Sequence, residues 1–349
     1  MTKSYILTCF LLISSFSTIS APIKIICSTD NIGTSLHVVA LEKFGQLIAK
    51  YSNNRLTTEI HYRGNKAFPA IMGEEDNMNM VMNSHQRIHV TVLASGNASL
   101  KASILEFLML PYIFPDKASA MRLFQSSFMI DEVNEVLASQ HKVRALGWLI
   151  GGFRHLTTSN KPVRRLQDLK GIVIRTPRNR LMRDTYKALG AEVVPLNWAD
   201  TFEALKSGKV DGQENPYSVI VDSKFWQAKQ KYVTTNGSFL WVGPILINEE
   251  FFQSIPDDLQ QVILRAGQEA SEFQWQWHHE KTDSFKEVIR SNNMQIVNLQ
   301  DKPEWADATK GLWKKYHKFI GYGDSEKGKA VLDKVLMITG DGNKASVIK

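Results

Sequence analysis

Two arginines and four polar or aromatic residues in the middle of the chain are the strongest candidates for chemistry in this sequence. Arg154 and Arg175 each stand beside a segment that is expected to end a strand. The guanidinium group of arginine matches a carboxylate through two parallel hydrogen bonds. The full set of candidate ligand-binding residues is Arg154, Arg175, Trp198, Gln213, Asn215 and Asn236. The pattern predicts an anion-binding cleft rather than an active site.

Simpler interpretations of the same residues stay open. Arg175 could form a structural salt bridge, and Trp198 could pack in the core. Glu214 is expected to be a solvated or lobe-bridging charge. The alternative function is an exported α/β enzyme, for instance a hydrolase that uses Glu214 or a histidine. That function needs a positioned nucleophile or paired carboxylates, and the sequence shows neither of them, nor a phosphate-binding loop or a GxSxG motif.

Alternating strands and helices would position these residues. We expect strands at 171–175, 191–196 and 209–211, separated by helices at 179–189 and 198–207. Two consecutive crossovers of this kind make a parallel sheet. Arg175 and Trp198 then lie at the carboxyl ends of neighbouring strands, where ligands meet such sheets. Gln213 and Asn215 are expected in a polar turn that follows the third strand and faces the same crevice.

The first part of the mature chain repeats this architecture. A strand at 21–28, a helix at 36–51 and a strand at 56–62 form a β-α-β unit, so the loops 29–35 and 62–68 are candidate cleft loops. Gly151 and Gly152 are expected to mark the crossing between two lobes. A helix at 256–290, about 50 Å long at 1.5 Å per residue, would tie the two lobes together.

The N-terminus has the features of a secretory signal peptide. Lys3 is followed by a short apolar stretch at 5–16 and by small residues that suit cleavage after Ser20. The apolar stretch is too short to span a membrane, so we expect an exported, periplasmic protein without stable membrane insertion. Cys27 would remain as the single cysteine of the mature chain, and we expect it to be a buried strand residue.

The charge and the histidines point to no larger partner and no cofactor. The net charge of +7 comes from scattered residues, without the basic stripe of a nucleic-acid binder. His85 and His89 stand four residues apart but lack an acidic partner for a metalloprotease pattern. Solvated or packed side chains are the default interpretation for His278 and His279. We therefore expect no metal, no cofactor and no nucleic acid.

Several runs of the sequence resemble one family. They are GFRHLTTSNKPVRRLQDLKGIVIRTP, ALGAEVVPLNWADTFEALKSGKVDGQENP, KFWQAKQKYVTT, LMLPYIFPD and NEEFFQSIPDDLQQVI. They look like the periplasmic solute-binding subunits of tripartite ATP-independent periplasmic (TRAP) transporters, the DctP type. The resemblance covers most of the mature chain and implies a two-lobed periplasmic binding protein fold, with mixed or parallel sheets flanked by helices. It also implies lobe closure on an organic acid and delivery to a sodium-coupled membrane permease.

The resemblance also implies roles for individual residues and a division of the chain. Arg175 matches the arginine that grips the ligand carboxylate, and Arg154 matches a second arginine that often helps. Trp198 and Asn215 match an aromatic and an asparagine of the family pattern. Residues 21–150 with about 241–275 would form the N-terminal lobe, and 151–240 with about 276–349 the C-terminal lobe, with the ligand cleft between them. A monomer is expected, with a dimer left open.

The sequence departs from the family pattern mainly in the N-terminal lobe. Residues 65–69 stand where a glycine-rich turn is usual, and His85 replaces a common glycine. Gly237 occupies the position of a histidine found in some sialic-acid binders. The choice among keto acids, C4-dicarboxylates, sugar acids and aromatic acids is therefore open, and we expect it to be made in the N-terminal lobe.

Overall fold

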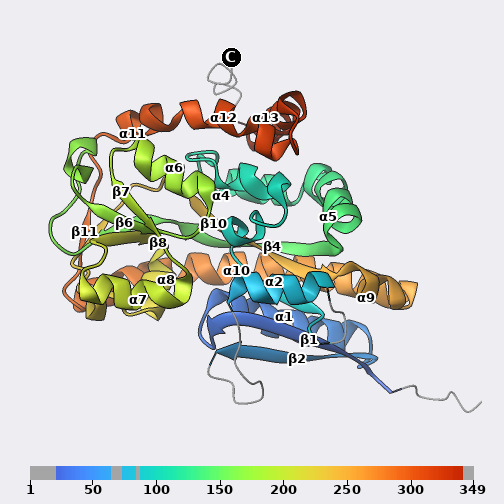
Figure 1. Ribbon diagram of the computed structural model, residues 1–349. Helices are drawn as coiled ribbons and strands as arrows, with labels where there is room; N and C mark the ends of the chain where they lie inside the picture. Colours follow the sequence, from blue (N-terminus) through green and yellow to red (C-terminus); the bar gives the residue numbers. More distant parts are fainter. Residues whose placement is uncertain (1–20, 64–72, 84–86, 341–349) are drawn as a thin grey trace, which may run out of the picture.

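Two mixed sheets flanked by helices form the molecule in the computed structural model, which describes residues 21–63, 73–83 and 87–340 (Figure 1). We call the part built on the first sheet the N-terminal lobe and the part built on the second sheet the C-terminal lobe. This architecture confirms the predicted two-lobed α/β fold. No helix within the described ranges is both long and apolar enough to cross a membrane.

The first sheet has five strands. In spatial order they are β2 (Leu56–Arg63), β1 (Ile23–Ile32), β3 (Val90–Val92), β10 (Leu240–Asn248) and β4 (Val143–Phe153). Both β2 and β3 pair in parallel with β1, whereas β10 runs antiparallel to β3 and β4. The predicted opening β-α-β unit is thus confirmed, with the first strand reaching Ile32 instead of residue 28. Cys27 is fully buried on β1, as expected.

The second sheet has six strands. In spatial order they are β11 (Gln295–Val297), β9 (Tyr232–Thr234), β5 (His155–Thr158), β8 (Gly212–Asn215), β6 (Val173–Thr176) and β7 (Glu192–Pro195). The predicted parallel core is confirmed, because β6 pairs in parallel with both β7 and β8. The strand expected at 209–211 was misplaced. Gly208 ends the preceding helix with a positive φ of 80°, and the chain needs three more residues before it can pair with β6.

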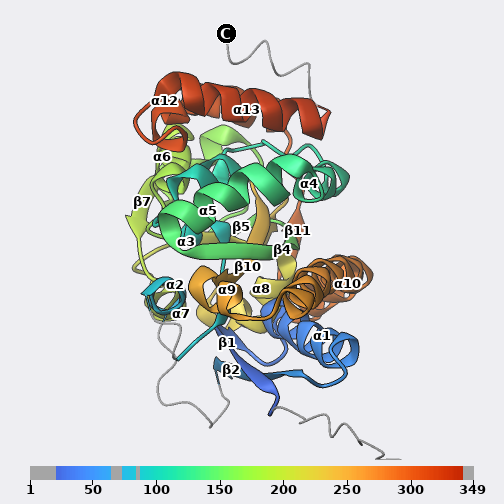
Figure 2. The same cartoon turned by 90° about the vertical axis from the view of Figure 1, so that its right-hand side faces the viewer.

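Helices cover both sheets. The longer ones are α1 (Leu36–Tyr51), α2 (Glu74–Asn83), α4 (Lys117–Phe124), α5 (Asn134–His141), α6 (Arg180–Ala188), α7 (Trp198–Ser207), α10 (Asp257–Ser291), α11 (Lys302–Thr309), α12 (Gly311–Ile320) and α13 (Ser325–Thr339). Shorter turns are α3 (Ser95–Ala98), η1 (Ser103–Met109), η2 (Phe128–Val133), η3 (Leu166–Leu169), α8 (Tyr217–Asp222), η4 (Phe225–Ala228) and α9 (Glu249–Ser254). Figure 2 shows α12 and α13 lying across the molecule above α4 and α6.

The helix α10 contacts both lobes, as the sequence predicted. It packs along α1 and β4 at one end and against α8 and β11 at the other. Asp257 and Asp258 occupy its first turn and Arg290 its last, the arrangement that the helix dipole favours. A single 35-residue helix therefore ties the two sheets together.

The crossing between the lobes falls later in the chain than expected. The strand β4 runs through Gly151 and Gly152 to Phe153 and stays paired with β10. Gly152 has a φ of 91°, and a β-carbon at this position would lie 2.8 Å from the His278 ring, so only glycine suits it within the strand. Arg154 alone separates β4 from β5. The candidate Arg154 thus sits at the junction between the two sheets.

Candidate ligand-binding site

Arg154 is held by a buried ion pair. Its Nε donates to Oε1 of Glu214 on β8, and its Nη2 donates to the Glu214 backbone oxygen at 2.6 Å. The hydroxyl of Tyr186 donates to the other carboxylate oxygen of Glu214 at 3.2 Å. Glu214 was expected to be a solvated or bridging charge, but it is 2% exposed because it points from β8 into the protein. Its carboxylate therefore compensates the charge of Arg154.

Arg175 has no such partner. Its Nε and Nη2 donate to the Leu196 carbonyl at 3.2 and 2.7 Å, and its guanidinium lies 5.7 Å from the centre of the Trp198 ring. No carboxylate in the described part of the chain forms an ion pair with it, although the side chain is almost fully buried. Burial, and then the nearby Arg154 charge, lower the pKa of Arg175 to about 9. A buried, charged guanidinium without an anion is costly, so this group is chemically suited to receive one.

Arg154, Arg175, Trp198 and Asn215 line one pocket, and we call these four residues the arginine wall. Arg175 and Trp198 reach it from the carboxyl ends of β6 and β7, as predicted from the crossover pattern. Asn215 donates to the Gln213 side-chain oxygen at 2.6 Å, so its amide is held in a fixed orientation.

Gln213 and Asn236 lie behind this wall rather than among the residues that line the pocket. Gln213 is on β8, not in a turn after it, and its amide donates to the Thr157 hydroxyl at 3.0 Å. Asn236 accepts a hydrogen bond from the Leu156 amide at 2.9 Å and donates to the Ser238 hydroxyl at 2.9 Å. Both side chains tie neighbouring segments of the C-terminal lobe together.

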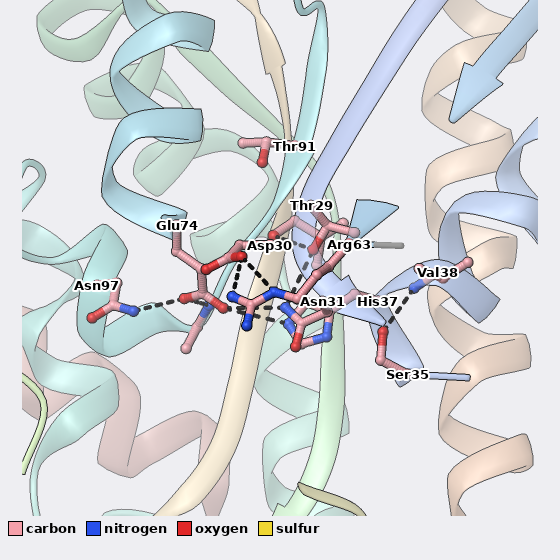
Figure 3. A network of polar contacts seen from close by, with 12 residues as sticks. Thr29, Asp30, Asn31, Ser35, His37, Val38, Arg63, Glu74, Thr91 and Asn97 are labelled. Atoms are coloured by element: carbon pink, nitrogen blue, oxygen red, sulfur yellow. Dashed lines mark hydrogen bonds and ion pairs between the residues drawn. The ribbon is translucent and has the colours of Figure 1, made fainter. Parts of the chain in front are cut away.

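The opposite side of the pocket comes from the N-terminal lobe, as expected, but its residues were not predicted individually. Asn31, His37, Glu74 and Asn97 line it, and we call them the glutamate wall. Figure 3 shows Glu74, the first residue of α2, between Asn97 of α3 and Asn31 of β1. Asn31 lies in the predicted cleft loop 29–35, whereas no motif in the sequence marked the other three.

Glu74 is a buried carboxylate whose hydrogen-bond donors are neutral groups, with the Asp30 carboxylate as a nearby like charge. It accepts hydrogen bonds from the Ala94 amide at 3.0 Å and from the Asn97 side chain at 2.7 Å. No lysine or arginine of the described segments pairs with it. Burial raises the pKa of Glu74, while the bonds from Asn97 and Ala94 oppose that rise. Its carboxylate therefore lacks a compensating cation, just as Arg175 lacks an anion.

His37 does not supply that cation. It is 3% exposed, its ring stands edge-on to Trp241 at 5.0 Å, and neither ring nitrogen makes a hydrogen bond. Its Nε2 lies 3.8 Å from Oε1 of Glu74. Burial lowers the pKa of His37 to about 3, so the ring is neutral at physiological pH.

The N-terminal lobe also has an arginine at the rim of the pocket, but this arginine is already paired. Arg63 of β2 donates through Nε to Oδ1 of Asp30 at 3.2 Å, and Asp30 is 3% exposed (Figure 3). These two residues and Trp198 line two further hollows that adjoin the pocket. Arg175 is thus the arginine of the pocket whose charge no carboxylate in the described segments balances.

This geometry defines a class of protein. Two α/β lobes, a long helix that ties them and an uncompensated arginine at the carboxyl ends of parallel strands are the features of a solute-binding protein. The chain belongs to the bacterial extracellular solute-binding proteins of family 7 (DctP), whose family model matches residues 31–318. The resemblance that the sequence motifs suggested is thereby confirmed.

Individual relatives support this membership. A solute-binding protein of Verminephrobacter eiseniae is 27% identical over 284 residues, which cover 81% of this chain and 82% of the relative. The apo, open crystal structure of a TRAP periplasmic solute-binding protein from Rhodobacter sphaeroides is 31% identical with a TM-score of 0.77, covering 90% and 99% of the two chains. The sugar-acid-binding protein DctPAm of Advenella mimigardefordensis, solved with galactonate, is 21% identical with a TM-score of 0.81, covering 91% and 99%.

The family also decides between the two functions left open by the sequence. Its members are solute-binding proteins, so this chain is a binding protein and not an enzyme. Glu214, the candidate catalytic carboxylate, is engaged with Arg154 and Tyr186.

The described residues contain no cluster of three or more histidine, cysteine or acidic side chains that could hold a metal ion. His85, one member of the spaced histidine pair, lies outside the described residues, and His89 accepts a hydrogen bond from the Ile26 amide through Nδ1 at 2.9 Å.

Proposed function

We propose that this protein captures a small organic acid between the arginine wall and the glutamate wall, with Arg175 as the anchor for the ligand carboxylate. The observation that carries the proposal is the buried Arg175 guanidinium, which forms no ion pair with a carboxylate of the described residues. A bound carboxylate would remove that deficit through charge-assisted hydrogen bonds. Arg154 lines the same pocket with its charge already paired to Glu214, while Trp198 offers an apolar face to the body of the ligand.

The supporting residues have graded roles in this proposal. Asn215 orients the ligand with an amide that Gln213 holds in place. Asn236 keeps β5 and the following loop in position through its bonds to Leu156 and Ser238. Gln213 and Asn236 therefore position neighbouring groups and do not contact the ligand themselves.

The glutamate wall favours a monocarboxylate whose other end carries hydroxyl groups. Two like charges 4 Å apart repel by roughly 4 kcal/mol at the effective dielectric constant of a protein surface, so a second ligand carboxylate beside Glu74 would be strongly disfavoured. A hydroxyl group instead can donate to Glu74 and exchange hydrogen bonds with Asn31 and Asn97. The structurally related DctPAm, which was solved with galactonate, binds a ligand of this kind.

We also propose the wider setting of the protein, which its family and its N-terminal sequence support. Residues 1–20 act as a signal peptide, the mature protein works in the periplasm as a monomer, and the lobes close on the ligand by a hinge motion. The N-terminal lobe comprises 21–150, extended by β4 to Phe153, with about 241–275, and the C-terminal lobe comprises 154–240 with about 276–349. The loaded protein delivers its ligand to a sodium-coupled TRAP permease.

A thermal-shift screen followed by calorimetry tests the proposal. A ligand that binds only the native state raises the melting temperature, by the equivalent of about 2.7 kcal/mol at one hundred times its Kd. We expect stabilisation by polyhydroxy monocarboxylates, little effect from C4-dicarboxylates and none from the matched carboxamides. Equal binding of an acid and its neutral carboxamide would refute the role of Arg175.

A further inference from the structure

Asn179 is a fully buried amide that lies between the two walls of the ligand pocket. It follows Arg175 closely in the chain, in the short segment that leads from β6 into α6. Its Oδ1 accepts a hydrogen bond from the Met182 amide at 2.9 Å and so caps α6. This cap uses only the oxygen of the side chain, which leaves its NH2 group to bond elsewhere.

The NH2 group of Asn179 reaches α3, the short turn that carries Asn97. It donates to the Gly96 carbonyl at 3.2 Å and to the Ser99 hydroxyl at 3.0 Å. The turn lies directly against this side chain, since a β-carbon at Gly96 would be 3.9 Å from that of Asn179. The next residue, Asn97, in turn donates to Glu74 at 2.7 Å. One amide therefore joins the segment behind the arginine wall to the turn that carries part of the glutamate wall.

The chain that follows α3 is also fixed to the C-terminal lobe. Trp313 of α12 donates through Nε1 to the Pro111 carbonyl at 3.2 Å. The Tyr112 amide donates to the Ser238 carbonyl at 2.7 Å. Segment 95–112 precedes residue 150 in the chain, but the bonds at both of its ends go to residues of the C-terminal lobe. These bonds therefore fix the position of α3 relative to β6, the strand that carries Arg175.

We propose that Asn179 is a positioning residue that sets the distance between Arg175 and Asn97, and thereby the length of the organic acid that the pocket accepts. This inference rests on the proposed anchoring of the ligand carboxylate by Arg175. The other end of an anchored ligand must reach Asn97 and Glu74. A ligand that is too short leaves these groups without a partner, and one that is too long does not fit between the walls. Asn179 is not among the residues that line the pocket, so its effect passes through α3.

Calorimetry with C4, C5 and C6 aldonates, which carry a carboxylate at one end and hydroxyl groups along the chain, tests this proposal on the mature protein. We expect the parent protein to bind one length at least about tenfold more tightly than the others, the equivalent of one well-placed hydrogen bond. Asn179→Ser keeps an oxygen for the cap of α6 but is too short to reach α3. It should reduce the preference to about threefold or less, with the largest loss of affinity for the preferred length.

A second variant approaches the same contact from the other side. Ser99→Ala removes one of the two acceptors of the Asn179 amide without changing the cap of α6, so it should reduce the length preference by a smaller factor. The control Asn134→Ser removes a different buried amide, which bonds to the backbone of Ala145 at 2.8 and 3.0 Å outside the ligand pocket. It should lower the melting temperature but keep the length preference. A merely structural role of Asn179 would give this same result for Asn179→Ser.

A double-mutant cycle with Asn97→Ala tests whether Asn179 acts through α3. We expect Asn97→Ala to weaken aldonate binding less in the Asn179→Ser background than in the parent protein, because residues of one hydrogen-bond network are not additive. Additive losses would overturn the proposal. An unchanged length preference in folded Asn179→Ser, or equal binding of all three lengths by the parent protein, would overturn it as well.

The anchor can fail separately from this inference. Aldonate binding that Arg175→Ala leaves unchanged would refute the proposed function, and so would a parent protein that binds no aldonate; the inference would then fall with it. A loss of binding in Arg175→Ala, together with the parent's length preference in Asn179→Ser, would refute the role of Asn179 alone.

Discussion

The two walls of the ligand pocket each hold a buried carboxylate, and the difference between their surroundings separates anchoring from selection. Glu214, just behind the arginine wall, is paired with Arg154. Glu74, in the glutamate wall, is surrounded by amides and a neutral histidine. Behind the arginine wall, the Glu214 carboxylate is paired with Arg154, so Arg175 is left without an ion-pair partner among the described residues. The glutamate wall leaves the Glu74 carboxylate without an ion-pair partner, so a ligand bound as we propose would meet a cation at one end and an anion at the other.

The comparison also explains why substrates would vary within one fold. A carboxylate anchor is common to all organic acids, and it requires only that Arg175 stay buried and charged. The distal part of the ligand must match the hydrogen-bonding groups of Glu74, Asn97 and Asn31. A single change in the glutamate wall can therefore alter specificity without changing the anchor.

The largest effect is expected from the anchor. Removing one partner of a buried charge pair costs about 2–5 kcal/mol, so Arg175→Ala should weaken ligand binding by at least about 30-fold in calorimetry. Arg175→Lys keeps a positive charge but loses the planar fork. Its ligand affinity should therefore lie between those of the parent protein and of Arg175→Ala. The control Arg164→Ala removes an exposed arginine outside the pocket and should bind normally. Tight binding by a folded Arg175→Ala protein would contradict the assignment.

The second effect concerns the stability of the arginine wall. Glu214→Gln leaves Arg154 buried without its counter-charge, which should lower the free energy of unfolding by about 3–5 kcal/mol. The control Glu203→Gln removes an exposed carboxylate of α7 that pairs with Lys206, and such surface pairs contribute at most about 1 kcal/mol. Urea unfolding measures both values. Similar small losses in the two variants would show that Arg154 finds another partner or water.

The two walls also differ in how well they can be predicted from the sequence. The arginine wall follows from local rules, since the alternation of strands and helices places Arg175 and Trp198 at adjacent strand ends. Patterns within short stretches of sequence also predicted the fold class, the long helix and the family resemblance. The helix α7 ends at Gly208 as predicted, but the strand expected at 209–211 begins only at Gly212, because three residues of irregular chain follow the helix.

The glutamate wall could not be predicted in this way. Asn31, His37, Glu74 and Asn97 come from four separate elements and meet only when the N-terminal lobe folds. A carboxylate in the first turn of a helix, such as Glu74, is ordinarily a favourable charge for the helix dipole. Whether it is solvated or buried in a pocket depends on long-range packing, for which its sequence neighbours carry no signal.

A third prediction uses pH to probe His37. Its pKa is about 3 in the folded protein and about 6.5 in the unfolded chain, so only the unfolded state takes up a proton between these values. Its contribution therefore lowers the free energy of unfolding as the pH falls below 6.5, by about 2 kcal/mol at pH 5. His37→Leu removes this contribution. In urea unfolding, the free energy of unfolding of the variant should therefore rise relative to that of the parent protein as the pH falls from 7.5 to 5. The control His279→Leu changes an exposed ring of α10 and should run parallel to the parent at all pH values.

The smallest effect should come from Glu74, and it is the one that distinguishes the two walls most directly. Glu74→Gln keeps the size of the side chain and one acceptor for the Asn97 amide, but it removes the negative charge. Binding of a polyhydroxy monocarboxylate should weaken by about tenfold, the equivalent of losing one hydrogen bond to a charged group. Binding of a C4-dicarboxylate should strengthen, because the repulsion of its second carboxylate disappears.

The ratio of the two affinities is the quantity to measure, since it cancels any general loss of stability. The control Glu42→Gln removes an exposed charge of α1 that lines neither the pocket nor the two adjoining hollows, and it should leave the ratio unchanged. If Glu74→Gln also leaves the ratio unchanged, the glutamate wall does not select the ligand. Selection would then rest with Trp198 and the other apolar contacts of the pocket, on the same side as the anchor.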